Sequence, residues 1–132
     1  MTAVEKYFFT PLYYPRSAWA VVAWWESRRL LFNLCVGSAG LVTLASVTLL
    51  AHLPPHPTGF FLPWAPVLVY ALMANVGYSL GPLGDLLLRR AMGDRASAIA
   101  PVLFRYGFVF AVGLTLLPIP MAVLGWLFRF FV

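Results

Sequence analysis

A run of 24 residues without Asp, Glu, Lys or Arg, from Leu30 to Leu53, constrains this chain more than any other feature. As a helix rising about 1.5 Å per residue, the run is about 36 Å long and can cross a hydrocarbon layer of about 30 Å. Of the 132 residues, 62% are hydrophobic and 10% are charged, whereas a soluble domain is closer to half apolar and a quarter charged. The sequence therefore predicts an all-α integral membrane protein, with residues 1–132 as a single membrane domain.

A second span is expected at 60–80. The segment Pro54–Gly59 separates it from the first span, because proline cannot continue a helix and glycine favours a turn. After the second span, the segment Gly81–Asp85 contains Pro82 and two glycines. These residues predict a kink or break, with a short amphipathic continuation at the membrane interface.

A third span is expected at 102–128. Pro118 and Pro120 fall in its middle, so we expect one helix that is kinked at the prolines. Two separate spans would need about 40 apolar residues, which this segment does not have. A pair of re-entrant half-helices is the alternative.

An interfacial amphipathic helix is expected at 17–29, before the first span and either separate from it or continuous with it. Ser17 can cap this helix, and Trp19, Trp24 and Trp25 favour the head-group layer. The segment is too short and too charged at its end to cross the membrane. Residues 1–17 hold aromatics, prolines and mixed charges, and we expect an irregular segment near the membrane.

The positive charges are distributed unevenly about these spans. Those before the first span or beside the second loop are Lys6, Arg16, Arg28, Arg29, Arg89, Arg90, Arg95 and Arg105, whereas Arg129 is alone at the far end. Loops rich in Lys and Arg stay in the cytoplasm. The pattern predicts a bacterial inner-membrane protein with its N-terminus cytoplasmic and its C-terminus periplasmic. Because these charges flank apolar runs, we expect anionic head groups as partners rather than nucleic acid.

The polar residues at membrane depth are expected to gather at the cytoplasmic side. They are Glu26, Arg29, Asn33, Asn75, Tyr78, Asp85 and Arg105. We expect Asp85 to pair with Arg105, and Asn33 and Asn75 to bridge helices. Such groups serve either to hold the helices together or as a lipid head-group or ligand site, with arginines binding phosphate. We expect no catalytic residue here, because a lone carboxylate beside an arginine is not an activated base.

His52 and His56 are the only candidates for cofactor binding, because their spacing of four residues would place both on one helix face. Pro54 and Pro55 lie between them, so the helix is expected to have ended, and no metal site is predicted. A pigment or haem shared with a neighbouring subunit is left open for His52, and no cofactor is evident. Cys35 is the only cysteine, which excludes an internal disulfide.

Small residues predict where the helices pack closely. Gly77 and Gly81 are four apart on the second span, and Gly107 and Ala111 repeat the spacing on the third. Such pairs let helix backbones approach each other. The spacing therefore supports a tight three-helix bundle.

Two stretches resemble a pattern found in small bacterial inner-membrane proteins without an assigned function. The stretches are Trp24-Trp25-Glu26 with Arg28, Arg29 and Asn33, and Asn75 with Tyr78, Leu80 and Gly81. The resemblance covers these stretches only and implies no activity. The chain contains no phosphate-binding glycine loop, nucleophile elbow or zincin helix.

These observations favour a non-catalytic small subunit or an assembly and stabilising factor of a larger membrane protein complex. A photosynthetic or respiratory complex is one kind of host. The aromatic residues, at 17% of the chain, exceed what a three-helix core can enclose, so other membrane-protein subunits are expected partners. The alternatives are a lipid-handling enzyme or small transporter that uses the polar residues, and a homo-oligomeric membrane protein.

Overall fold

The computed structural model of the chain describes residues 2–10, 17–59, 64–93 and 99–131. This part of the chain is helical and contains no strand. Its five helices are α1 (Ala3–Phe9), α2 (Ala18–His52), α3 (Trp64–Met92), α4 (Ile99–Leu116) and α5 (Pro118–Phe128). Helices α2 and α3, and the successive pair α4–α5, are each long and apolar enough to cross a membrane.

Helix α2 joins the segment expected at 17–29 to the span expected at 30–53 without interruption. Its N-cap is Ser17, as expected, and the Ser17 hydroxyl accepts a hydrogen bond from the backbone N–H of Ala20 at 3.3 Å. Helix α2 ends at His52, immediately before the proline-rich segment. The interfacial segment and the first span are thus one helix, the continuous form of the expectation.

Helix α3 continues through the segment where a break was expected. It runs from Trp64 to Met92, with Pro82 inside the helix. The predicted break at Gly81–Asp85 is therefore wrong. Proline removes only one bond of the helical ladder, and neighbouring helices and local adjustments make such a loss tolerable in apolar surroundings. Residues 60–63, the expected start of this span, lie outside the described residues.

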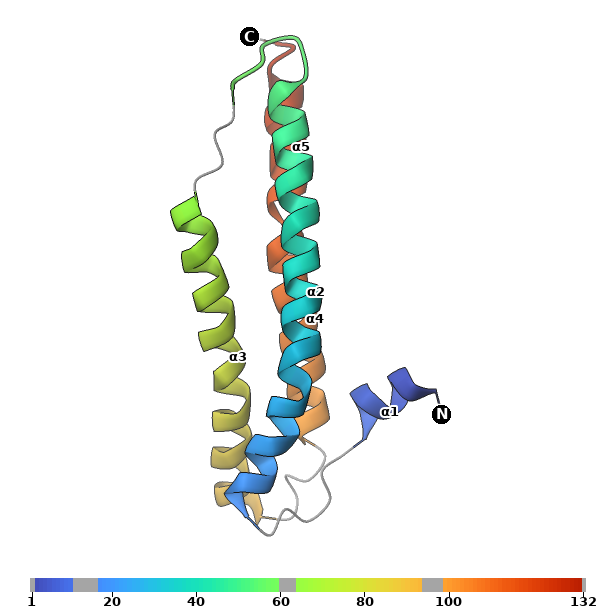
Figure 1. Cartoon of the computed structure of the whole chain (residues 1–132), viewed down its shortest axis with the longest axis vertical. Coiled ribbons are helices and arrows are strands. Elements are labelled where there is room, and N and C mark those ends of the chain that lie inside the picture. The colour runs from blue at the N-terminus through green and yellow to red at the C-terminus, as the bar shows by residue number, and fades with distance from the viewer. Residues whose placement is uncertain (1, 11–16, 60–63, 94–98, 132) are drawn as a thin grey trace.

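Helices α4 and α5 follow one another in the same direction. Leu117 separates them, and its backbone N–H still donates to the carbonyl of Gly113 at 3.0 Å. Pro118 and Pro120 occupy the first and third positions of α5, where N–H groups have no partner within the helix. Both α4 and α5 pack along α2, as Figure 1 shows. The part of the chain from Ile99 to Phe128 is thus one long helical segment interrupted at the prolines, and not a re-entrant pair.

The helices converge at one end of the molecule. Helix α2 packs against α3, α4 and α5, and α3 also contacts α4. Figure 1 shows that the C-terminal part of α3 approaches the start of α2, whereas the N-terminal part of α3 stands apart from α2. The tightest packing is therefore at the end where α2 begins and α3 finishes.

Helix α1 occupies part of the segment 1–17 that was expected to be irregular. Residues 11–16 of that segment lie outside the described residues. Thr2 and Glu5 form a capping box: the Thr2 side chain accepts from the Glu5 backbone, and the Glu5 carboxylate accepts from the Thr2 backbone at 2.6 Å. The Thr-x-x-Glu spacing that predicts this cap is present in the sequence. Helix α1 packs beside α4, and its Tyr7 and Phe8 side chains are half-buried against the core.

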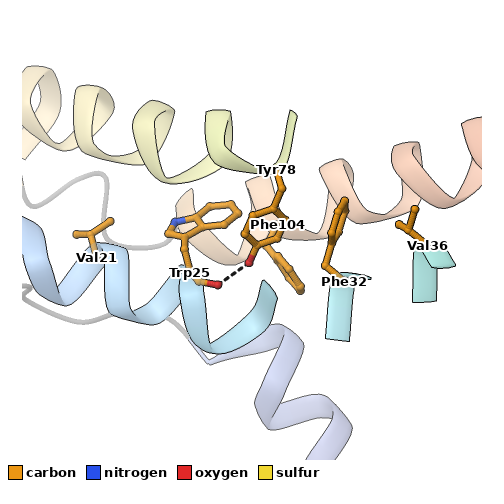
Figure 2. Close-up of a cluster of buried hydrophobic side chains, with 6 residues drawn as sticks. All are labelled: Val21, Trp25, Phe32, Val36, Tyr78 and Phe104. Carbon is orange, nitrogen blue, oxygen red and sulfur yellow. Dashed lines mark hydrogen bonds between the residues drawn. The ribbon is translucent and has the colours of Figure 1, made fainter. Parts of the chain in front are cut away.

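Six buried side chains from three helices form the core. They are Val21, Trp25, Phe32 and Val36 from α2, Tyr78 from α3 and Phe104 from α4. Figure 2 shows these side chains between the three helices. The rings of Phe32 and Tyr78 lie 4.7 Å apart, and those of Trp25 and Phe104 lie 6.0 Å apart. Both separations are typical of packed aromatic pairs.

Candidate functional site at the arginine-rich end

Five arginines surround the end of the molecule where α2 and α4 begin and α3 finishes. They are Arg28, Arg29, Arg89, Arg90 and Arg105, and we call this region the arginine-rich end. The acids on the same three helices are Glu26 and Asp85. Five positive against two negative side chains leave an excess of three positive charges.

Asp85 is the most deeply buried charged residue of this region, with 0% of its surface exposed. Its Oδ2 accepts a hydrogen bond from Nε1 of Trp25 at 3.1 Å, and its Oδ1 accepts from Nε of Arg89 at 2.7 Å. The carboxylate thus joins α2 to α3. Buried charges require such partners, because removing an unpaired charge from water is very costly.

The expected pair of Asp85 with Arg105 does not form. Nε of Arg105 instead donates to the carbonyl of Pro101 at 3.3 Å. The Arg105 guanidinium lies over the ring of Phe9, 4.6 Å from its centre. Arg105 therefore connects α4 to α1. Asp85 pairs instead with Arg89, which lies one turn further along α3.

Glu26, Arg29 and Tyr78 do come together where α2 meets α3. Arg29 forms an ion pair with Glu26 at 2.7 Å and donates to the Ser79 hydroxyl at 3.3 Å. Its guanidinium also lies 4.9 Å from the centre of the Tyr78 ring. The Tyr78 hydroxyl donates to the backbone carbonyl of Trp25. These contacts place three of the predicted polar residues in one network.

Asn33 and Asn75 do not bridge the helices as expected. The Asn75 amide donates to the Ala71 carbonyl of its own helix at 3.1 Å. Asn33 is exposed on α2. The hydrogen bonds between α2 and α3 in this region are instead made by Trp25, Tyr78 and Arg29.

Arg28 is a buried residue that the sequence did not single out. It is 8% exposed, its Nε donates to the Tyr7 carbonyl at 3.1 Å, and its guanidinium lies 3.7 Å from the ring centre of Trp24. The Tyr7 hydroxyl donates in turn to the Ser27 carbonyl at 2.9 Å. Burial raises the pKa of the Tyr7 phenol above its ordinary value of 10.0, and the positive charge of Arg28 opposes part of that rise.

A second polar contact lies far from the arginine-rich end. The Thr43 hydroxyl donates to the Thr115 carbonyl at 2.7 Å, and Thr115 also bonds to the Tyr70 hydroxyl. The contact joins α2, α3 and α4 at one level. The expectation that the polar contacts gather only at the cytoplasmic side is therefore wrong, because hydroxyl groups of Thr and Tyr pair across helices wherever they meet.

Of the small residues expected to pack closely, Gly81 does so and two others do not. A Cβ atom on Gly81 would lie 2.6 Å from Cη2 of Trp25, so only glycine fits there. A Cβ on Gly77 or Gly107 would meet no atom within 4 Å. Ala111 is partly buried against the core.

Gly77 and Gly107 instead line an apolar groove of about 460 Å³ between α3 and α4. Its walls lie within residues 70–81 of α3 and 103–114 of α4, and the α2 residues that line it are Trp25 and Phe32. Gly77 and Gly107 widen the groove, because neither places a side chain on its walls. A site of this volume and polarity is within the range of small-molecule pockets.

The two histidines lie at the opposite end of the molecule. His52 is the last residue of α2, and His56 lies beyond the helix end. Nδ1 of His52 is 2.8 Å from the Thr48 carbonyl. Among the residues that the structure describes, no three His, Cys, Asp or Glu side chains cluster as metal ligands would. A role for His52 toward a pigment or haem remains a prediction.

The chain matches no protein-family model, no curated protein and no solved structure.

Proposed function

We propose that the chain is a non-catalytic accessory subunit or assembly factor of a larger complex in the bacterial inner membrane. The observation that carries the proposal is the outward face of α3. Large apolar side chains recur along it at intervals of four and seven residues: Leu68, Leu72, Val76, Leu83 and Leu87. We call this face the α3 stripe. Each of its side chains is about half exposed or more, from 49% for Val76 to 68% for Leu68.

The α3 stripe has the geometry of a helix-packing surface. Side chains four residues apart form ridges that fit the grooves of a neighbouring helix. Lipid tails cover apolar side chains as well as protein does, so hydrophobicity alone does not select a helix partner. The N-terminal part of α3 also stands apart from α2 (Figure 1), so this part of α3 has less packing within the chain than its C-terminal part.

The buried state of Asp85 supports a non-catalytic role. Its surface is 0% exposed and both its oxygens are engaged, by Trp25 and Arg89. A transporter or a lipid-modifying enzyme that used Asp85 would need this carboxylate to reach its substrate. We therefore assign Asp85 to the stability of the bundle.

The proposal is tested by gentle extraction from native membranes, followed by measurement of the particle mass and identification of co-purifying proteins. The wild-type particle should exceed the mass of the 14.7 kDa chain and contain other proteins. Leu72→Trp combined with Val76→Trp should release those partners, because bulky rings disrupt the ridge. Met121→Trp on α5, which is also exposed at 64%, should retain them.

Two outcomes would contradict the proposal. A particle made only of copies of this chain would favour the homo-oligomeric alternative. A monomer that carries no other protein, in every extraction condition that preserves the fold, would exclude both kinds of assembly.

A further inference from the structure

The groove between α3 and α4 is separate from the α3 stripe. On α3 it is lined by residues such as Tyr70, Ala74, Gly77 and Gly81, which lie on a different face of the helix from Leu72 and Val76. The lining atoms are overwhelmingly apolar. An occupant must therefore be a hydrocarbon that lies along the groove.

The groove is too narrow for another helix. Helices α3 and α4 contact each other directly, whereas a helix with its side chains is about 10–12 Å across and packs 8–10 Å from its neighbour's axis. A third backbone cannot enter between two helices that already touch. A single hydrocarbon chain can, because it is much thinner and Gly77 and Gly107 face open space on opposite walls.

The length of the groove matches one leaflet of a membrane. Each wall extends over eleven residue steps, from Tyr70 to Gly81 and from Leu103 to Leu114, or about 16 Å of helix. Half of a hydrocarbon layer of about 30 Å is about 15 Å. The chain that fills this groove would therefore start at one surface of the membrane and finish near its middle.

The arginine-rich end supplies the charge that selects the head group. Gly81 and Leu103, at one end of the groove, are close in sequence to Asp85 and Arg105 of the arginine-rich end, whose helices carry five arginines and two acids. Basic residues at a membrane surface attract anionic lipids. We propose that the groove holds one acyl chain of an anionic phospholipid whose phosphate lies at the arginine-rich end.

The test compares lipid retention by wild-type protein and groove-filled variants. Protein is reconstituted with equal amounts of phosphatidylglycerol and phosphatidylcholine that carry the same acyl chains, re-extracted, and analysed by native mass spectrometry. Wild-type protein should keep one phosphatidylglycerol per chain in preference to phosphatidylcholine by roughly fivefold or more. A fivefold preference corresponds to about 1 kcal/mol, the attraction that one basic side chain near the membrane surface supplies. Gly77→Leu and Gly107→Leu should each lose that lipid, because the added side chain fills the groove.

Gly113→Leu is the matched control. Gly113 is exposed on α4, a Cβ there meets no atom within 4 Å, and it does not line the groove. The control should bind the lipid as wild-type protein does. Equal retention by Gly107→Leu and wild-type protein, or equal retention of the two lipids, would overturn the proposal.

A second measurement does not depend on the variants. Phosphatidylglycerol with a photoactivatable diazirine in its acyl chain should label wild-type peptides that contain residues 70–81 and 103–114. Labelling spread evenly over all apolar helices, α5 included, would show general lipid contact and would also overturn the proposal.

Discussion

Gly77 and Gly81 lie one turn apart on α3, but only Gly81 faces another residue closely. A Cβ on Gly81 would come within 2.6 Å of the Trp25 ring, whereas one on Gly77 would meet nothing within 4 Å. Gly81→Ala should therefore destabilise the protein by about 1–3 kcal/mol through overpacking. Gly77→Ala should be neutral or stabilising by up to about 1 kcal/mol, since alanine favours a helix. Thermal melting in detergent micelles would measure both, and equal effects would contradict the contact.

Asp85 and Glu26 form ion pairs that differ in burial. Asp85 is 0% exposed and pairs with Arg89, whereas the side chain of Glu26 is 47% exposed in its pair with Arg29. Breaking a buried pair leaves an uncompensated charge and costs about 3–5 kcal/mol. Exposed pairs contribute about 0–1 kcal/mol. Asp85→Ala should thus lower the melting temperature far more than Glu26→Ala, and similar losses would show that Asp85 is not buried.

Tyr7 makes the attachment of α1 sensitive to high pH. Burial raises the pKa of its phenol above 10.0, so the folded protein favours the neutral form, which donates to Ser27. The stabilisation is fully present below pH 10 and is lost as the pH rises through the raised pKa. A titration of tyrosinate absorbance should show this late step in wild-type protein and not in Tyr7→Phe. Ionisation of Tyr7 at or below pH 10 would contradict it.

Some of these contacts could be predicted from the sequence, and others could not. Asp85 and Arg89 are four residues apart, the usual spacing of a helical ion pair. The prediction paired Asp85 with Arg105 because both were expected at the same depth in the membrane, and it did not weigh this spacing. The bond between Trp25 and Asp85 spans 60 positions and depends on how α2 and α3 pack, so no local pattern could reveal it.

At the scale of elements, Arg129 connects three segments at the end opposite the arginine-rich end. Its Nη1 donates to the carbonyls of Leu50 and His56 at 3.3 and 3.2 Å, and its Nη2 donates to the Thr58 hydroxyl at 3.3 Å. Carbonyls in the last turn of a helix lack partners within the helix. The arginine thus caps α2 and holds the following loop against the end of α5.

Arg129→Met should therefore loosen that end selectively. We expect a loss of about 1 kcal/mol and faster backbone hydrogen exchange in residues 50–59, with no change around Trp25. Arg90→Met, at an exposed position of α3, is the control and should alter neither segment. Uniformly faster exchange in Arg129→Met would indicate general destabilisation instead.

The long apolar helices could be predicted better than the path of α3 through Pro82 or the short helix α1. The long runs of residues with almost no charged side chain predict α2 and the α4–α5 segment, because an apolar run of this length is typical of a membrane-spanning helix. The errors fall at Pro82 and at α1, where local rules compete. A proline was expected to interrupt α3 but is tolerated inside it, and the Thr2–Glu5 capping box starts a helix that the neighbouring prolines and aromatics obscured.

At the scale of the whole molecule, the positions of the positive charges and the number of membrane spans together predict on which side of the membrane each end of the chain lies. Eight of nine Lys and Arg residues lie before the uncharged run that begins at Leu30 or at or near the loop between α3 and α4, and basic loops remain in the cytoplasm. Three helical segments long enough to span would place the two ends of the chain on opposite sides. An even number of spans would place them on the same side.

Single cysteines near the two ends of the chain can test both its orientation in the membrane and the number of its spans. Val4 and Phe131 are 66% and 85% exposed, so Val4→Cys and Phe131→Cys, each combined with Cys35→Ala, should fold normally. A membrane-impermeant maleimide should label Phe131→Cys in right-side-out vesicles and Val4→Cys in inverted vesicles. Reversed labelling would contradict the orientation and leave three spans intact. Labelling of both from the same side would contradict the number of spans, because an odd number always separates the ends.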